Sequence, residues 1–336
     1  MAEGNATPTS RPRKILTDIS PASWEHPADR AALQALRAVP GFDLAVKKII
    51  GFFGERGIRL IFQANSVRVG PTQFPKLYSL LQEVRTTMDW EEDVPLFVSQ
   101  TPVVNAGAYG VDHPFIVLNS GAVDLLNEDE SRVLIGHELG HVMSGHALYH
   151  TILALILAIG IRNLPFLAGI ALLPIRLALQ EWSRKSELSA DRAGLLTAQD
   201  RDQALRIYLK LAGGGLTTTD QISLPAFMEQ AHEYEGYGGL DAIYKILNML
   251  DASHPFNTLR AAELDRWHNT GDYSKIVEGD YIRRSDASTH RPLRDDLSEG
   301  AGYYAKEARE AVGQVADAAR KAARAFSDAF KDAGSR

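Results

Sequence analysis

Over most of the chain, apolar positions recur at the spacing of an α-helix. This pattern predicts helices within residues 27–56, 74–88, 202–211, 225–234, 240–250 and 258–267. Shorter runs rich in Val, Ile and Phe predict strands at residues 58–63, 96–104 and 115–118. The sequence therefore predicts an α+β fold that is mostly α, with a small sheet.

The best-defined predicted helix begins after Asn127. Asn127 is a typical N-cap, and the three acidic residues that follow it form a first turn with a capping-box partner at Glu130. Buried positions are then expected along the next turns, at Val133, Leu134, Val142 and Leu148. The segment that follows the predicted strands is therefore expected to be helical.

This helix carries the motif His137-Glu138-Leu139-Gly140-His141. Because a step of four residues is about one turn, His137 and His141 lie one above the other and can bind the same metal. Glu138 lies about 100° round the helix, where it can reach a metal-bound water without binding the metal. The motif predicts a zinc site with Glu138 as the catalytic base.

A catalytic zinc ion usually has three protein ligands, so a third ligand is expected elsewhere in the chain. Glu187 and Asp191 stand four residues apart on one predicted helical face. Glu187 could complete the metal shell, and Asp191 could accept the free ring N–H of a ligating histidine. A solvated acidic face is the alternative for such a pair. His146 and His150 lack the spacing for a further ligand on the same face.

Four motifs together resemble a known family. They are residues 137–142, 187–191 and 104–106, and residues 253–255 followed by Arg260. In order and approximate spacing they resemble the HtpX-like zinc endopeptidases, H-E-x-x-H gluzincins related to the CAAX prenyl proteases. The resemblance, which covers residues 96–264, implies a zincin-type metallopeptidase with one zinc ion per chain and a sheet edge beside the zinc helix.

The resemblance also implies roles outside the metal shell. Asn105 and Ala106 would belong to a strand edge that holds an extended substrate by main-chain hydrogen bonds. An ordinary strand end with a turn-forming Asn is the alternative. His254 and Arg260 match the late His-Pro segment of the family, where they could stabilise an oxyanion or gate the cleft. Capping of the helix that starts near Pro255 is a further possibility for His254.

These residues predict a zinc-dependent metalloendopeptidase. A zinc-activated water would lose its proton to Glu138 while attacking a peptide carbonyl, and Glu138 would pass the proton to the leaving nitrogen. Polypeptides are the expected partners, and the resemblance implies misfolded or membrane-associated ones. Two alternatives stay open: a prenyl-protein protease, and a non-catalytic, zinc-stabilised chaperone-like or membrane-scaffold protein.

Composition narrows the class of protein. The chain has 336 residues, of which 45% are hydrophobic, and its net charge of −6 argues against a nucleic-acid partner. The absence of Cys excludes thiolate zinc ligands and a catalytic cysteine. Residues 1–14 contain no apolar run of the kind found in signal peptides, which predicts a cytoplasmic protein.

Residues 151–179 are the most apolar stretch. Arg162 and Asn163 divide it into halves, each shorter than the roughly 20 residues that span a bilayer as a helix. His141 and Glu187 flank the stretch and would bind one metal, so a single crossing is excluded. Two interpretations stay open: a hydrophobic hairpin that dips into the cytoplasmic leaflet as a peripheral contact, or a flap buried on the core.

The segments define the expected domain organisation. Residues 1–22 are predicted to be disordered, residues 23–282 to form the metallopeptidase domain, and residues 283–300 to form a linker. Residues 301–336 are predicted to form an amphipathic helix, whose Ala-rich and Val-rich stripe suits packing on protein better than adsorption to lipid. The sequence leaves the oligomeric state open.

Overall fold

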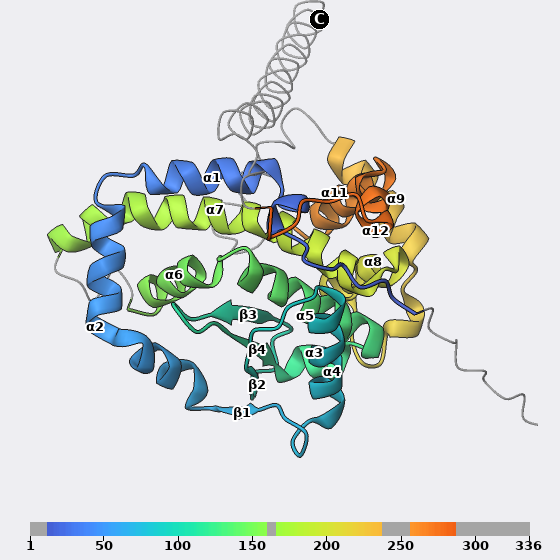
Figure 1. Ribbon diagram of the computed structural model, residues 1–336, viewed down its shortest axis with the longest axis horizontal. Helices are drawn as coiled ribbons and strands as arrows, with labels where there is room; N and C mark the ends of the chain where they lie inside the picture. The colour runs from blue at the N-terminus through green and yellow to red at the C-terminus, as the bar shows by residue number, and fades with distance from the viewer. Residues whose placement is uncertain (1–11, 160–165, 237–255, 287–336) are drawn as a thin grey trace, which may run out of the picture.

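Helices make up most of the structure (Figure 1). The computed structural model describes residues 12–159, 166–236 and 256–286. The longer helices are α1 (Pro27–Arg37), α2 (Phe42–Gln63), α3 (Pro75–Thr87), α5 (Glu128–Met143), α6 (Ala147–Ile159), α7 (Phe166–Ala198), α8 (Arg201–Gly213), α9 (Leu224–Gly236) and α11 (Asn257–Asn269). The shorter ones are η1 (Pro21–Ser23), α4 (Ser120–Leu125), η3 (Thr219–Gln221) and α12 (Asp272–Glu278).

A mixed four-stranded sheet lies beside α5 (Figure 1). Its strands are β1 (Ser66–Arg68), β2 (Leu96–Ser99), β3 (Ala106–Tyr109) and β4 (Phe115–Asn119), in the order β1-β2-β4-β3. The β2–β4 pair is parallel and the other two pairs are antiparallel. β3 is an edge strand that also contacts α5 and α6. The predicted mostly helical α+β fold, with a small sheet edge beside the H-E-x-x-H helix, is therefore confirmed.

Most of the predicted helices are present with ends shifted by one or two residues: α3, α8, α9 and α11 correspond to four of the predicted segments. The capping box of α5 is also present. The Asn127 side chain accepts a hydrogen bond from the Glu130 amide, and the Glu130 carboxylate accepts one from the Asn127 amide. The Lys210 ammonium lies 2.6 Å from the same carboxylate and compensates its burial.

Small residues allow α5 and α7 to pack closely. A Cβ atom at Gly136 would clash with the Thr197 hydroxyl oxygen, and one at Gly140 would lie 2.5 Å from the Ala193 Cβ. Any side chain at either position would therefore push the helices apart. This close packing holds the H-E-x-x-H face of α5 against the C-terminal half of α7.

The described residues form two large hydrophobic cores and a small third cluster of Phe97, Phe115 and Val117 on the sheet. The main core lies between the sheet and helices α3, α5, α8 and α11, and includes Leu80, Ile116, Leu139 and Leu205. The second core lies among α1, α2, α6 and α7, and its buried members include Phe42, Ile152, Leu179 and Trp182. α7 contributes to both cores, so it connects the metal-site region to the N-terminal helices.

The strand predicted at residues 58–63 is wrong, because this segment is the end of α2. Ile58 is buried, but Leu60 and Ile61 are both exposed, so the alternation in the sequence does not correspond to one buried face. α2 has a kink at Gly54, whose φ is 66°, and helical hydrogen bonding continues beyond it to Gln63. Helical hydrogen bonding therefore overrides the strand propensity of the β-branched residues.

The strand predicted at residues 96–104 is shorter than expected and ends at Ser99. The Thr101 amide donates to the Ser99 carbonyl in a tight turn, and Pro102, which has no N–H, follows. Pairing resumes at Ala106, where β3 begins, and apolar alternation predicts neither this strand nor β1. The strand predicted at residues 115–118 corresponds to β4.

The prediction of disorder up to residue 22 is wrong for the described part of that segment. Leu16 and Ile19 are fully buried in the main core. Ile19 forms an antiparallel bridge with Arg283, and the Ser20 amide donates to the Ile282 carbonyl at 2.9 Å. The two apolar side chains are too few and too far apart to give a periodic signal. The helices predicted at residues 240–250 and 301–336, and the predicted linker beyond residue 286, lie outside the described residues.

The apolar stretch at residues 151–179 divides between α6 and α7, with the junction at 160–165 outside the described residues. Ile152, Ile156 and Leu179 are buried in the second core, whereas Leu173 and Leu177 are exposed. In the described part of the chain, no single helix has the length and hydropathy of a membrane span. α5 joined to residues 147–158 passes that test as a pair bent by 97°.

Candidate metal centre and active site

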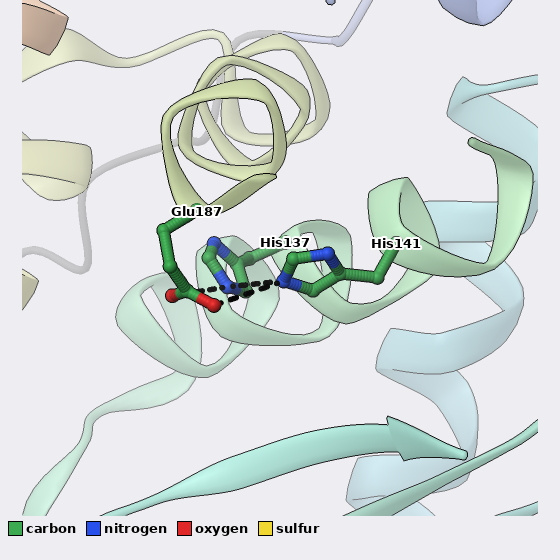
Figure 2. A group of neighbouring side chains, drawn as sticks. All are labelled: His137, His141 and Glu187. Carbon is green, nitrogen blue, oxygen red and sulfur yellow. Dashed lines mark hydrogen bonds and ion pairs between the residues drawn. The ribbon is translucent and has the colours of Figure 1, made fainter. Parts of the chain in front are cut away.

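Three buried side chains from α5 and α7 converge on one point (Figure 2). The Nε2 atoms of His137 and His141 are 3.2 Å apart, and each lies 3.4 Å from a carboxylate oxygen of Glu187. One ligand atom from each residue lies within 4.8 Å of the other two. Two imidazoles and a carboxylate at this spacing fit the donor set of a divalent transition metal.

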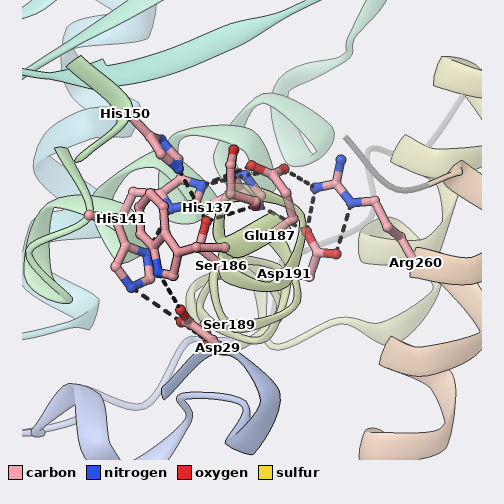
Figure 3. Close-up of polar contacts among 12 residues, drawn as sticks. Asp29, His137, His141, His150, Ser186, Glu187, Ser189, Asp191 and Arg260 are labelled. Atoms are coloured by element: carbon pink, nitrogen blue, oxygen red, sulfur yellow. Dashed lines mark hydrogen bonds and ion pairs between the residues drawn. The ribbon is translucent and has the colours of Figure 1, made fainter. Parts of the chain in front are cut away.

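Asp191 lies behind His137, one turn along α7 from Glu187 (Figure 3). Its carboxylate oxygen is 3.0 Å from His137 Nδ1, the ring nitrogen that faces away from Glu187. Arg260 of α11 reaches both acidic residues, with its Nη2 2.5 Å from Asp191 and 3.1 Å from Glu187. The Arg260 guanidinium also lies over the ring of Tyr208, 5.1 Å from the centroid. Arg260 is thus engaged with the carboxylates that face the metal centre.

Glu138 is buried at the edge of the same centre. Its Oε2 atom has no hydrogen-bond partner among the described residues. Burial, with repulsion from Glu187 and Asp191, outweighs the attraction of His137 and Arg260 and raises the pKa of Glu138 to about 7. A carboxylate with a free oxygen and a pKa near neutrality is suited to accept and return a proton.

The second ring nitrogen of His141 faces a different set of groups. His141 Nδ1 lies 3.0 Å from His146 Nδ1, and His146 Nε2 lies 3.2 Å from the Asp29 carboxylate. Gly145, with φ of 71°, turns the chain after α5 so that the His146 ring packs behind His141. No pattern in the sequence indicates Asp29, which lies on α1, because the contact depends on how α1 packs on α7.

The two histidines of the motif differ electrostatically. Burial opposes the charged form of both imidazoles. At His137, hydrogen bonds to Asp191 and Glu187 outweigh burial and raise the pKa to about 10. At His141, burial dominates and lowers the pKa to about 4. The carboxylates of α7 therefore dominate the environment of His137, whereas burial dominates that of His141.

A cavity of about 530 Å³ opens over the metal centre. Asn105 and Ala106 line it together with Glu138, as does Tyr109 of β3. The structure thus brings Asn105 and Ala106 to the same cavity as the histidines, at the start of the edge strand. Tyr109 was not predicted; burial, with the nearby Glu138 and Glu187 carboxylates, raises its pKa to about 12. His254 lies outside the described residues.

Comparisons with known proteins agree with this arrangement. The model of Peptidase family M48 matches residues 71–268, which include His137, His141, Glu187 and Asp191. The chain is 32% identical over 271 residues to plastoglobule-localized metallopeptidase 48, a chloroplastic protein of Arabidopsis thaliana. The match covers 80% of this chain and 78% of that relative. No solved structure matches. The chain therefore belongs to peptidase family M48, in agreement with its resemblance to the HtpX-like enzymes, and is a metallopeptidase.

Proposed function

We propose that this protein is a zinc-dependent endopeptidase that hydrolyses peptide bonds in unfolded or membrane-associated polypeptides. One observation carries the proposal: a buried oxygen of Glu138, which has no hydrogen-bond partner within the described residues, lies beside two histidines and a glutamate that converge under an open cavity. A purely structural zinc site is closed and has no use for a carboxylate in this position. The geometry therefore favours catalysis over a scaffold role.

His137, His141 and Glu187 would hold the metal, which when bound supplies the Lewis acidity that activates a water and polarises the scissile carbonyl. Glu138 takes the proton of the attacking water on its free oxygen and delivers it to the leaving nitrogen. Asp191 fixes the orientation of His137, and Arg260 balances the charge of Asp191 and Glu187. No covalent intermediate with the chain is formed.

The edge of β3 is the proposed position of the substrate main chain. Ala106 pairs with Leu118 of β4 on one side only, since β3 ends the sheet. Asn105 and Ala106 line the cavity above Glu138. An extended peptide added to this edge would form main-chain hydrogen bonds that depend little on its side chains. This binding mode suits a protease of broad specificity.

We also propose that some of the substrates lie at a lipid surface, to which this protein binds. Phe52 of α2 is 83% exposed, and Leu157, Leu173 and Leu177 at the adjoining ends of α6 and α7 are also exposed. Lys47, Lys48 and Arg56 accompany the exposed apolar residues of α2 and would complement anionic headgroups. Leu157 also lines the active-site cavity, so a lipid surface bound there would lie beside the catalytic centre. The relative in Arabidopsis is described as plastoglobule-localized, which supports this proposal.

The experiment that tests the catalytic proposal compares wild type with Glu138→Gln for cleavage of casein, with bound zinc measured in both. Loss of a general base is expected to slow cleavage by about 10²- to 10⁴-fold while zinc is retained, because Glu138 is not a ligand. If both proteins bind zinc and neither cleaves, with or without lipid, the scaffold alternative replaces the protease.

A further inference from the structure

The N-terminal helix α1 contributes a buried carboxylate close to the metal centre. Asp29 lies outside residues 71–268, the part of the chain matched by the family model. We propose that Asp29 and His146 form a positioning relay that holds His141 in the tautomer required for metal binding. This inference rests on the proposed metal site and extends it to a part of the chain that the motifs do not include.

Asp29 is held rigidly for such a role. It is only 1% exposed, and its Oδ2 accepts a hydrogen bond from the Ser189 hydroxyl at 2.6 Å. Its Oδ1 accepts one from the Trp182 indole N–H at 3.0 Å. Ser189 and Trp182 belong to α7, so the carboxylate of α1 is fixed on the same helix that carries Glu187 (Figure 3). Two such donors compensate the cost of burying the charge.

The relay assigns each ring proton. His141 must direct a lone pair from Nε2 to the metal, because Nε2 faces His137 and Glu187. Its proton is then on Nδ1, which donates to His146 Nδ1 at 3.0 Å. His146 must therefore carry its own proton on Nε2, the atom that lies 3.2 Å from Asp29. A carboxylate accepts that proton's hydrogen bond and cannot donate one, so it selects this tautomer.

Without the Asp29 carboxylate, His146 would no longer be restricted to this tautomer. His146 could then present an N–H from Nδ1, and His141 would have to accept it. The proton of His141 would move to Nε2, where it blocks the metal. His137 has a direct carboxylate partner in Asp191, whereas His141 reaches Asp29 only through His146. The two histidine ligands are thus oriented by different hydrogen-bonded partners, and each set of partners ends at an aspartate.

The test measures the zinc affinity of the full-length chain by competition with a chelator, together with the unfolding of the metal-free protein. Asp29→Asn and His146→Leu are each expected to weaken zinc binding by about 10- to 100-fold, the range for removal of a partner of a ligating histidine. His146→Gln is expected to retain more affinity than His146→Leu, because a side-chain amide oxygen can still accept from His141 Nδ1.

Trp182→Phe is the matched control. It removes another hydrogen bond to Asp29 and disturbs the same core, but leaves the contact between Asp29 and His146. It is expected to lower the stability of the metal-free protein with little change in zinc affinity. The relay is overturned if Asp29→Asn binds zinc like wild type, or if Trp182→Phe loses as much zinc affinity as Asp29→Asn does. It is also overturned if His146→Gln binds zinc no better than His146→Leu. If wild type itself binds no zinc, the proposed function fails as well.

Discussion

The two halves of α7 have opposite characters. The C-terminal half carries Glu187 and Asp191, both buried and bonded to charged partners, and it packs on α5 through Gly140. The N-terminal half exposes Leu173 and Leu177 and has an internal proline, Pro174. One helix therefore joins a region in which buried charges are held by charged partners to a region that exposes leucine side chains.

The two halves of α7 are expected to tolerate substitution differently. In the C-terminal half, substitution of Glu187 or Asp191 removes a partner from a buried charge, which costs far more than the loss of a surface contact. In the N-terminal half, Leu173 and Leu177 are 41% and 53% exposed, so their substitution disturbs less buried surface. Substitutions in the C-terminal half should affect metal binding and the fold, and those in the N-terminal half should affect association with lipid.

The largest expected effect is that of Glu187→Ala. Loss of a direct ligand should weaken zinc binding by more than the roughly 100-fold found for outer partners of a site, and casein cleavage should fall with it. Zinc content after dialysis and the cleavage rate are the measurements. Glu181→Ala, which removes a half-exposed carboxylate from the same helix, is the control and should change neither. Zinc retention by Glu187→Ala would remove this residue from the ligand set.

Gly140→Leu should destabilise the protein by about 1–3 kcal/mol, because the new side chain would meet Ala193 across the α5–α7 contact. Gly51→Ala on α2 has no atom within 4 Å of the added Cβ and should be neutral or stabilising by up to about 1 kcal/mol. Denaturant unfolding of the metal-free proteins measures both changes. Equal stabilities would show that the α5–α7 contact can open to accept a side chain.

The same contrast explains what could be predicted from the sequence. The residues of the metal centre repeat at helical spacing, so His137, His141, Glu187 and Asp191 could be placed on shared faces from their spacing alone. The capping box at Asn127 located the start of α5 in the same way. Local periodicity was sufficient because each of these relations lies within one helix.

Relations between distant segments could not be predicted. Asp29 approaches His146 only because α1 packs along α7, and Leu16 is buried only because the N-terminal segment lies on the main core. The end of α2 was predicted as a strand, since its β-branched residues favour one and the kink at Gly54 leaves no periodic signal. Tertiary packing determines these contacts and the helical end of α2. The residue pattern of a single sequence does not show how distant segments pack.

The smallest expected effect concerns the N-terminal half of α7. The double substitution Leu173→Glu and Leu177→Glu should reduce binding to vesicles that contain anionic lipid by about 30-fold, since the two partly exposed leucines would together contribute on the order of 2 kcal/mol of insertion. Co-sedimentation with vesicles measures the binding. Cleavage of casein without lipid should be unchanged, because neither side chain lines the cavity.

Leu216→Glu, at an exposed leucine in the segment after α8, is the control for added negative charge and should bind vesicles like wild type. Equal loss of binding in the control would mean that net charge alone governs adsorption, and the apolar surface of α7 would then have no specific role. A loss confined to the α7 variant would assign the two halves of this helix to different tasks. The C-terminal half would hold the metal, and the N-terminal half would hold the protein at a lipid surface.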